Sequence, residues 1–190
     1  MTTLVTHPTA TAQWYELVNE AETAAAQPLV EELESYLVFL LMRFTRRPEI
    51  ADTLLALEYL NGAREVGRLQ QERLKDVGDQ CLLFSGLFPQ QAERRRVKAS
   101  YFVDLGRCAY LQLSTLLSNT SAELYAHLSQ DFVPLMDVLH VIGKGTAPTP
   151  PLLQTFELWQ DTGSRWAFEA MRSAAPAALP VARYDFQSLH

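Results

Sequence analysis

The sequence has little glycine and no segment typical of a β-strand. Only 8 of its 190 residues are glycine, and no stretch alternates apolar and polar residues over six positions. Such alternation is the usual mark of a half-buried strand, so a repetitive β architecture is disfavoured. Charged residues are also few, at 20%, against 48% hydrophobic residues. This balance excludes an intrinsically disordered chain and predicts a globular domain with a substantial core.

Long apolar runs and a secretory leader are missing as well. The longest apolar run, from Tyr36 to Met42, is far shorter than the roughly 20 residues that span a bilayer. The first residues, MTTLVTHPTATAQW, contain no Lys or Arg and no apolar core, unlike a signal peptide. We therefore expect a soluble, cytoplasmic protein without a membrane span.

Positive charge and cysteine are both scarce. The formal net charge of −6 disfavours nucleic acid as a partner, because binding to phosphates needs a positive surface. One basic run, Arg94-Arg95-Arg96, cannot form a single stripe, because consecutive helical residues point about 100° apart. The two cysteines, Cys81 and Cys108, are far apart and belong to no zinc-binding pattern. We expect both to be free, buried thiols.

What is abundant is helical periodicity, which predicts an all-α protein. The expected architecture is an antiparallel bundle of about six helices, followed by a C-terminal helical hairpin and an extended tail. The predicted division is an N-terminal arm over residues 1–10, the bundle over 11–143, a Gly/Pro linker over 144–151, and the hairpin with its tail over 152–190. The expected helices cover approximately residues 11–26, 28–47, 48–60, 63–84, 90–117, 121–142, 151–160 and 164–174.

Several positions carry more specific expectations. Thr11 and Ser164 are the predicted N-caps of the first and last helices. The segment 36–44 is apolar on nearly all sides, so its helix is the candidate for the centre of the bundle. Asp79 lies with the charged residues opposite the apolar arc of its helix, which predicts a solvated position. Gly106 borders an apolar arc, where it would allow a neighbouring helix to approach closely.

Acidic and histidine residues recur with helical spacing in the segment 121–142. Glu123, His127 and Asp131 are four residues apart, and Asp137 and His140 form a pair three apart. Such spacing can place metal ligands on one helix face. These side chains lie mostly opposite the apolar arc, however, and would face solvent unless another element covers them. The Glu-x-x-His and His-Glu-x-x-His patterns are missing, so we expect no metal site and no cofactor.

The helix over about 90–117 carries the best candidate for a polar ligand site. Arg96, Ser100, Asp104 and Arg107 share one side of this helix, with Tyr101 beside them. The two arginines could donate to an anionic or polar ligand, with Asp104 orienting Arg107. The alternative is a solvated stripe in which Asp104 and Arg107 simply form a local pair.

The C-terminal part is rich in aromatic residues, among which Trp159, Trp166, Phe168, Tyr184 and Phe186 are the candidates for an interaction surface. Short helices are marginal in isolation, so this hairpin must dock on another element. It could dock on its own bundle, or on a partner protein or second copy of the chain.

Sequence features of a catalytic centre are poor. The chain has no Gly-x-Ser-x-Gly elbow and no P-loop, and no strand precedes a glycine-rich loop. We therefore expect a non-catalytic interaction or regulatory protein that binds a protein partner or self-associates. The alternative is a helical-bundle small-ligand binder or enzyme with a polar site between helices.

Overall fold

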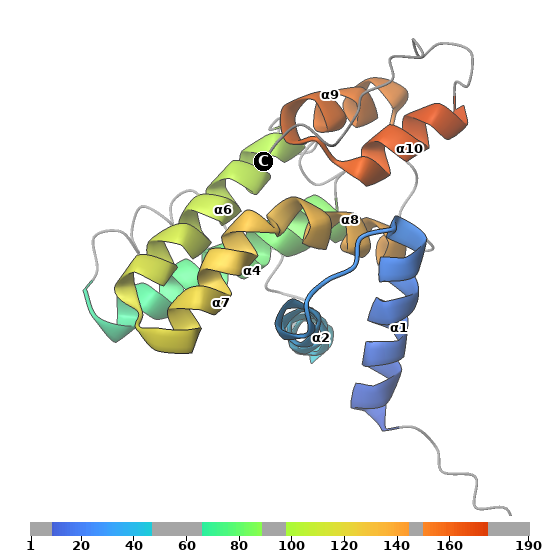
Figure 1. Cartoon of the computed structure of the whole chain (residues 1–190). Coiled ribbons are helices and arrows are strands. Elements are labelled where there is room, and N and C mark those ends of the chain that lie inside the picture. The colour runs from blue at the N-terminus through green and yellow to red at the C-terminus, as the bar shows by residue number, and fades with distance from the viewer. Residues whose placement is uncertain (1–8, 47–65, 89–97, 145–149, 175–190) are drawn as a thin grey trace, which may run out of the picture.

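The computed structural model describes residues 9–46, 66–88, 98–144 and 150–174 (Figure 1). Within these ranges the chain forms eight helices and no strand, which confirms the predicted all-α class. None of the described helices is long and apolar enough to cross a membrane. The helices are α1 (Ala10–Ala25), α2 (Glu31–Arg46), α4 (Arg68–Leu87), α6 (Ala99–Leu116), α7 (Asn119–Gln130), α8 (Phe132–Gly143), α9 (Leu152–Thr162) and α10 (Arg165–Ala174).

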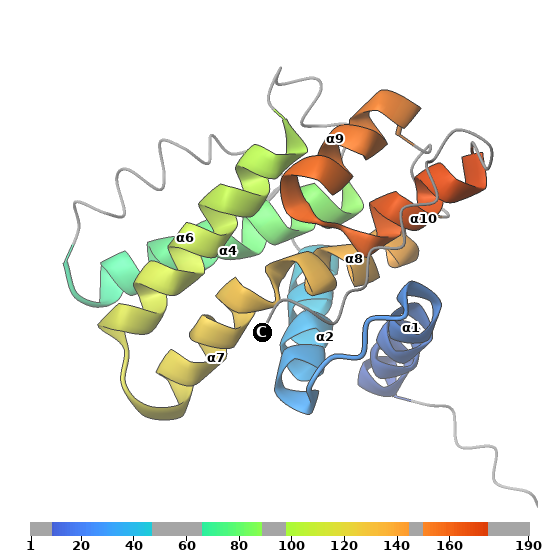
Figure 2. The same cartoon turned by 45° about the horizontal axis from the view of Figure 1, so that its top comes forward.

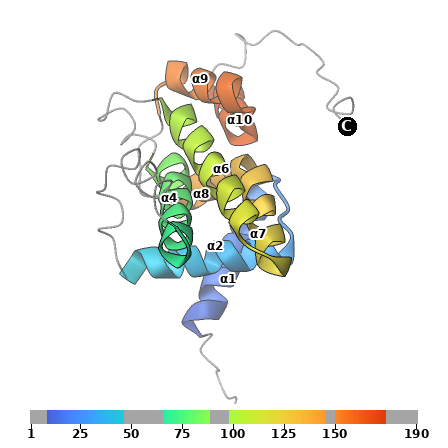
Figure 3. The same cartoon turned by 90° about the vertical axis from the view of Figure 1, so that its left-hand side faces the viewer.

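The long helices α4 and α6 pack against each other in opposite directions, and α7 returns along α6 (Figures 1 and 2). Helix α2 lies crosswise to this layer, while α1 packs against both α2 and α8 (Figures 1 and 3). The hairpin of α9 and α10 lies at one end of the molecule, where α9 contacts α6 and α10 contacts α8. The hairpin thus meets the bundle through two different helices.

The centre of the bundle is α4, and the expectation that the helix over 28–47 would take this place is wrong. Every residue of α4 from Val77 to Leu87 is buried, because both α6 and α8 pack against it. Helix α2 buries five aliphatic side chains but leaves Phe39 59% exposed. The apolar helix α2 is therefore exposed on one side, whereas α4, which contains polar residues, is buried on all sides over this segment.

Glycines allow the close approach of these helices. A Cβ on Gly106 of α6 would lie 2.5 Å from the ring of Phe132 and 2.8 Å from Cβ of Cys81, so only hydrogen fits there. The predicted role of Gly106 is thereby confirmed. A Cβ on Gly78 of α4 would likewise lie 2.4 Å from the ring of Tyr110.

The helix boundaries correct the sequence predictions in two places. Thr9, not Thr11, caps α1, because the helix begins at Ala10 and the Thr9 hydroxyl accepts from the Ala12 N–H at 3.3 Å. The single helix expected over 121–142 is broken at Asp131 into α7 and α8. Pro134 explains the break, because proline lacks the N–H that would continue the α-helical hydrogen bonds.

The two cysteines are free, as expected, but differ in burial. Cys81 of α4 is buried against the neighbouring helices, and burial raises the pKa of its thiol. Cys108 is exposed, so its predicted burial is wrong. It lies on α6 next to the buried Ala109, just outside the apolar arc. The helix expected over 48–60 and the arginine run at 94–96 lie outside the described residues.

Candidate functional site

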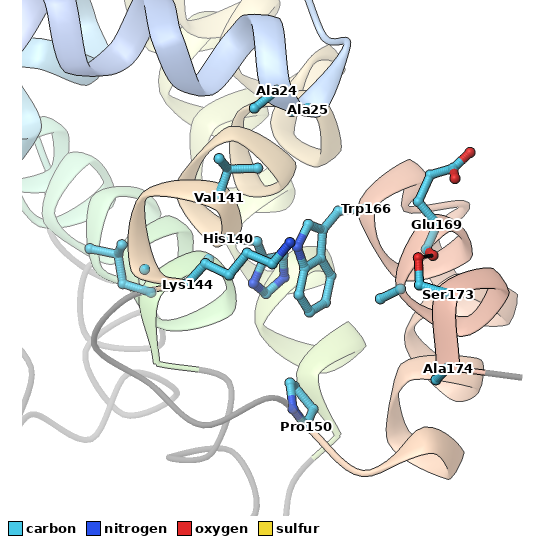
Figure 4. A pocket seen from close by; sticks show the side chains of 14 residues that line it. Ala24, Ala25, His140, Val141, Lys144, Pro150, Trp166, Glu169, Ser173 and Ala174 are labelled. Atoms are coloured by element: carbon cyan, nitrogen blue, oxygen red, sulfur yellow. Dashed lines mark hydrogen bonds between the residues drawn. The ribbon is translucent and has the colours of Figure 1, made fainter.

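A pocket of about 440 Å³ lies where the C-terminal hairpin meets the bundle. Its walls come from the ends of α1, α4 and α8 and from one side of α10 (Figure 4). Small apolar side chains make up much of the lining, among them Ala24, Ala25, Ala170 and Ala174. The pocket is therefore an apolar space with a few polar groups, the usual composition of a small-molecule site.

His140 of α8 and Trp166 of α10 stack on each other in this pocket (Figure 4). Their ring centroids are 4.1 Å apart and their planes are inclined by 19°. His140 is only 4% exposed, and burial lowers the pKa of its imidazole to about 3 against the opposing effect of a hydrogen bond to the Gly86 backbone. The imidazole is therefore neutral at physiological pH.

The two ring nitrogens of His140 have different surroundings. The hydrogen bond with Gly86 favours the protonated ring, so the ring donates it and the Gly86 carbonyl accepts. The other nitrogen, Nε2, is buried and has no hydrogen-bond partner. In a neutral imidazole whose other nitrogen donates, Nε2 is an acceptor. His140, which lines the pocket, thus carries a buried acceptor that no group of the described chain satisfies.

Charged groups lie at the rim of the pocket. Lys144, at the end of α8, is exposed and approaches from the His140 side, whereas Glu169 and Ser173 lie on the α10 side (Figure 4). Glu169 is engaged in an ion pair with Arg172 at 2.7 Å. Lys144 is therefore the charged group on the His140 side, and the ion pair of Glu169 lies on the α10 side.

Asp137 positions the wall that α10 contributes. This carboxylate is fully buried on α8, one turn before His140. It accepts hydrogen bonds from the Ser164 hydroxyl at 2.5 Å and from the backbone N–H groups of Arg165 at 2.9 Å and Trp166 at 3.2 Å. These N–H groups belong to the first turn of α10, which has no partners for them within the helix. Asp137 therefore holds the helix end that carries Trp166.

Ser164 completes this cap, as predicted. Its hydroxyl oxygen accepts from the Ala167 N–H at 3.1 Å while its hydrogen goes to Asp137. Gln27, in the connection between α1 and α2, adds a further hydrogen bond to Asp137 at 3.3 Å. Burial raises the pKa of Asp137, and its hydrogen bonds, with that from Ser164 the largest, act in the opposite direction.

The acidic and histidine residues of the segment 121–142 do not form one cluster. Asp137 and His140 are covered by α10, whereas Glu123 and His127 on α7 are exposed and Asp131 lies between the two helices. Among the residues that the structure describes, no group of three or more His, Cys, Asp or Glu side chains could hold a metal ion.

A second buried carboxylate, Asp79 of α4, lies at the centre of the bundle, so its predicted solvation is wrong. It is 1% exposed and accepts hydrogen bonds from the hydroxyls of Tyr36 and Tyr110, the latter at 2.7 Å, and from the guanidinium of Arg43. Burial, and then the negative charge of Asp79, raise the pKa of both phenols well above 10, so both remain donors. Asp79 thus joins α2, α4 and α6.

A groove of about 740 Å³ runs between α2 and α7 on the other side of the molecule from the hairpin. Phe39, which is 59% exposed, and Val30, which is 57% exposed, supply apolar surface from the α2 side. Leu124 and His127 face them from α7. The ring of His127 lies 3.8 Å from the carboxylate of Glu32 across the groove.

Two of the predicted ligand residues on α6 bind neighbouring helices. The hydroxyl of Ser100 donates to Asp161 of α9 at 2.9 Å. Arg107 donates from Nε to the carbonyl of Ser129 at 3.1 Å, and the Ser129 hydroxyl returns a bond to the Arg107 carbonyl at 3.0 Å. Both residues therefore connect α6 to an adjacent helix.

The remaining residues of that predicted site are Tyr101, Asp104 and Arg96. Tyr101 and Asp104 are exposed on α6, and Arg96 lies outside the described residues. Neither Tyr101 nor Asp104 lines the pocket beside α10 or the groove between α2 and α7. A polar ligand site on this face of α6 stays a prediction.

Three aromatic residues of the hairpin, Trp159, Trp166 and Phe168, are partly buried. Trp159 of α9 and Phe168 of α10 pack against each other with centroids 5.7 Å apart, and Trp166 covers His140. Tyr184 and Phe186 lie outside the described residues. These three side chains therefore pack within the hairpin or between the hairpin and α8, whereas Phe156 is 40% exposed.

Comparison of the chain with models of protein families, with curated proteins and with solved structures gives no match. The geometry alone must therefore indicate the function. Sequence reasoning missed Asp79 and the unpartnered nitrogen of His140. The only signal in the sequence that Asp79 is buried is the adjacent Gly78. The missing side chain at Gly78 leaves room for the Tyr110 ring.

Proposed function

We propose that this is a non-catalytic interaction protein that binds a basic, amphipathic helix of a protein partner in the groove between α2 and α7. The observation that carries this proposal is the exposure of Phe39. Helix α2 buries five aliphatic side chains, yet presents this large aromatic ring to solvent at 59% exposure, with Val30 exposed nearby. Large apolar side chains exposed along one groove are typical of an interaction site.

The shape of the groove suits a helix. Glu31, Ser35 and Phe39 are four residues apart, so they form one stripe along α2, with α7 as the opposite wall. From Glu31 to Phe39 the helix rises about 12 Å. An amphipathic helix that places apolar residues at positions i, i+3 or i+4 and i+7 has a similar length of contact surface.

The charges of the groove favour a basic partner. Glu31 and Glu32 lie at the end of the groove where α2 begins, and the residues of the described ranges that line the groove include no Lys or Arg. The whole chain carries a formal net charge of −6. Lys or Arg residues beside the apolar stripe of a partner helix would therefore be attracted to this end, and acidic residues there would be repelled.

Two model peptides test this proposal: a helix with leucines along one face and lysines elsewhere, and its counterpart in which glutamates replace the lysines. Fluorescence anisotropy is expected to show saturable binding of the leucine–lysine peptide at least tenfold tighter than the counterpart. Phe39→Glu should abolish this binding. Leu153→Glu, which places the same charge on another exposed apolar residue, should leave it unchanged. Equal affinity for both peptides, or equal effects of the two substitutions, would contradict the proposal.

A second candidate is self-association through the outward face of α9. Leu153 is 69% exposed there, with Leu152 and Phe156 also exposed on the same helix. Both signs of charge lie at the margin, where Lys98, the residue before α6, approaches Glu157 at 4.0 Å. A two-fold interface brings a patch against itself, so it requires charges that are complementary within the patch.

The mass of the protein in solution tests this second candidate. The full chain should form a dimer as its concentration rises, and Leu153→Glu should shift the monomer–dimer equilibrium toward monomer by at least tenfold. Phe39→Glu serves as the matched control and should leave the equilibrium unchanged. A full chain that remains monomeric up to millimolar concentration would rule out self-association through α9.

A further inference from the structure

We propose that the pocket beside α10 is a binding site for a small, neutral, mostly apolar molecule that donates one hydrogen bond to Nε2 of His140. This site is separate from the groove between α2 and α7. The proposal rests on three features of the pocket: its size, the chemistry of its lining, and the buried acceptor that lacks a partner.

The size and lining of the pocket fit a small ligand. Its volume of about 440 Å³ lies within the range of known small-molecule sites, roughly 300–1,000 Å³. Ala24, Ala25, Ala170 and Ala174 contribute short side chains that leave this space open, and the Trp166 indole adds a flat wall beside them. These groups offer a ligand apolar contact and no strong polar competition.

Nε2 of His140 determines which polar group the ligand must have. It is buried and without a partner, although buried polar atoms in folded proteins nearly always have one. The neighbouring nitrogen is occupied by the Gly86 carbonyl, so Nε2 presents a lone pair. The polar group of a ligand that binds this atom must therefore be an O–H or N–H donor.

The charges around the pocket favour a neutral ligand. The imidazole is neutral, and the carboxylate of Asp137 one turn away is already engaged by Ser164 and the first turn of α10. Lys144 is exposed at the rim, and Glu169 is paired with Arg172. An ion in contact with the imidazole would lose part of its hydration, and the neutral ring offers no charge in return.

Phenol and its methyl ether, anisole, form a matched pair of probes, because both are flat and apolar and only phenol can donate. In full-length protein with ¹⁵N-labelled histidine, we expect phenol to bind saturably and to move the His140 Nε2 resonance upfield. Anisole should bind at least tenfold more weakly and leave that resonance in place. The His140 signals are assigned by their disappearance in His140→Phe.

Variants separate the acceptor from the space around it. His140→Phe keeps a ring against Trp166 but removes the acceptor, so phenol and anisole should bind this variant equally. His127→Phe, at an exposed histidine, should keep the preference for phenol. Ala170→Leu fills the pocket while leaving His140 in place, so it should abolish binding of both probes, and this holds even if His140→Phe fails to fold.

Two results would overturn the proposal. One is equal affinity of the wild-type protein for phenol and anisole, which would mean that Nε2 does not contribute to binding. The other is a His140 resonance that does not move at any soluble concentration of phenol, which would mean that phenol does not bind Nε2.

Discussion

Asp137 of α8 caps the N-terminus of α10 from another helix. One carboxylate oxygen accepts from the Ser164 hydroxyl at 2.5 Å, and the other accepts from the backbone N–H of Arg165 at 2.9 Å. A helix is usually capped by the residue just before it, and Ser164 occupies that place here. Asp137 adds a contact between segments that are 27 residues apart in the sequence, so the start of α10 is fixed to the bundle.

Asp137→Asn should therefore destabilise the protein by about 2 kcal/mol, because the amide cannot accept from all the donors that now surround the carboxylate. Asp104→Asn, the same change at an exposed carboxylate on α6, should alter the free energy of unfolding by less than about 0.5 kcal/mol. Urea denaturation measures both effects. Hydrogen exchange should also become faster in α10 before it does in α4. Equal losses of stability in the two variants would show that the cap contributes little.

The same residues show how far the sequence could predict this protein. Periodicity gave the helices, their approximate limits and the Ser164 cap, because these depend on neighbours along the chain. It placed Asp79 in solvent, and Asp137 and His140 on a polar side, because a helical wheel describes one helix at a time. Whether a polar side is covered depends on α10 and α6, whose packing no local pattern encodes.

The pocket and the groove were unpredictable for a related reason. Each forms between helices that are distant in the sequence, and neither depends on a motif. Gly106 is the instructive exception. A glycine in a helix lowers helix propensity, so its presence beside an apolar arc indicates a close contact with another helix. The sequence does not indicate which helix makes that contact.

The tyrosines around Asp79 should behave as one coupled unit. Tyr36→Phe and Tyr110→Phe each remove one hydrogen bond to the buried carboxylate and should each destabilise the protein by about 1.5–3 kcal/mol. Their effects in the double variant should differ from the sum by at least about 0.5 kcal/mol, because both hydroxyls bind the same oxygen of Asp79. Tyr101→Phe, at an exposed tyrosine, is the control and should have almost no effect. Strict additivity in urea denaturation would contradict the shared role.

The close contact at Gly106 can be tested by adding one methyl group. Gly106→Ala should destabilise the protein by about 1–3 kcal/mol, since the new Cβ overlaps the Phe132 ring and the gain in helix propensity is only about 1 kcal/mol. Gly143→Ala is the matched control, because a Cβ there meets Leu87 at an ordinary 3.5 Å. Phe132→Leu in the Gly106→Ala background should recover part of the loss. Thermal or urea unfolding in which both alanine variants behave alike would contradict this packing.

His140 should make the stability of the protein depend on pH. Burial lowers its pKa in the folded state to about 3, whereas an unfolded chain has a histidine pKa near 6.5. Between these values the unfolded state binds one more proton, so the free energy of unfolding falls as the pH is lowered. From pH 8 to pH 4.5 this effect amounts to about 2–3 kcal/mol.

The comparison with His140→Phe isolates this effect from that of other groups near the imidazole. Asp137 has a raised pKa and acts in the opposite direction, but it is present in both proteins, as are Lys144 and Glu169 at the rim. The unfolding free energy of the wild type minus that of His140→Phe should therefore decrease by about 2–3 kcal/mol as the pH falls from 8 to 4.5. His127→Phe should retain the wild-type fall. Parallel curves for wild type and His140→Phe would mean that the imidazole reaches solvent and takes up a proton in the folded protein.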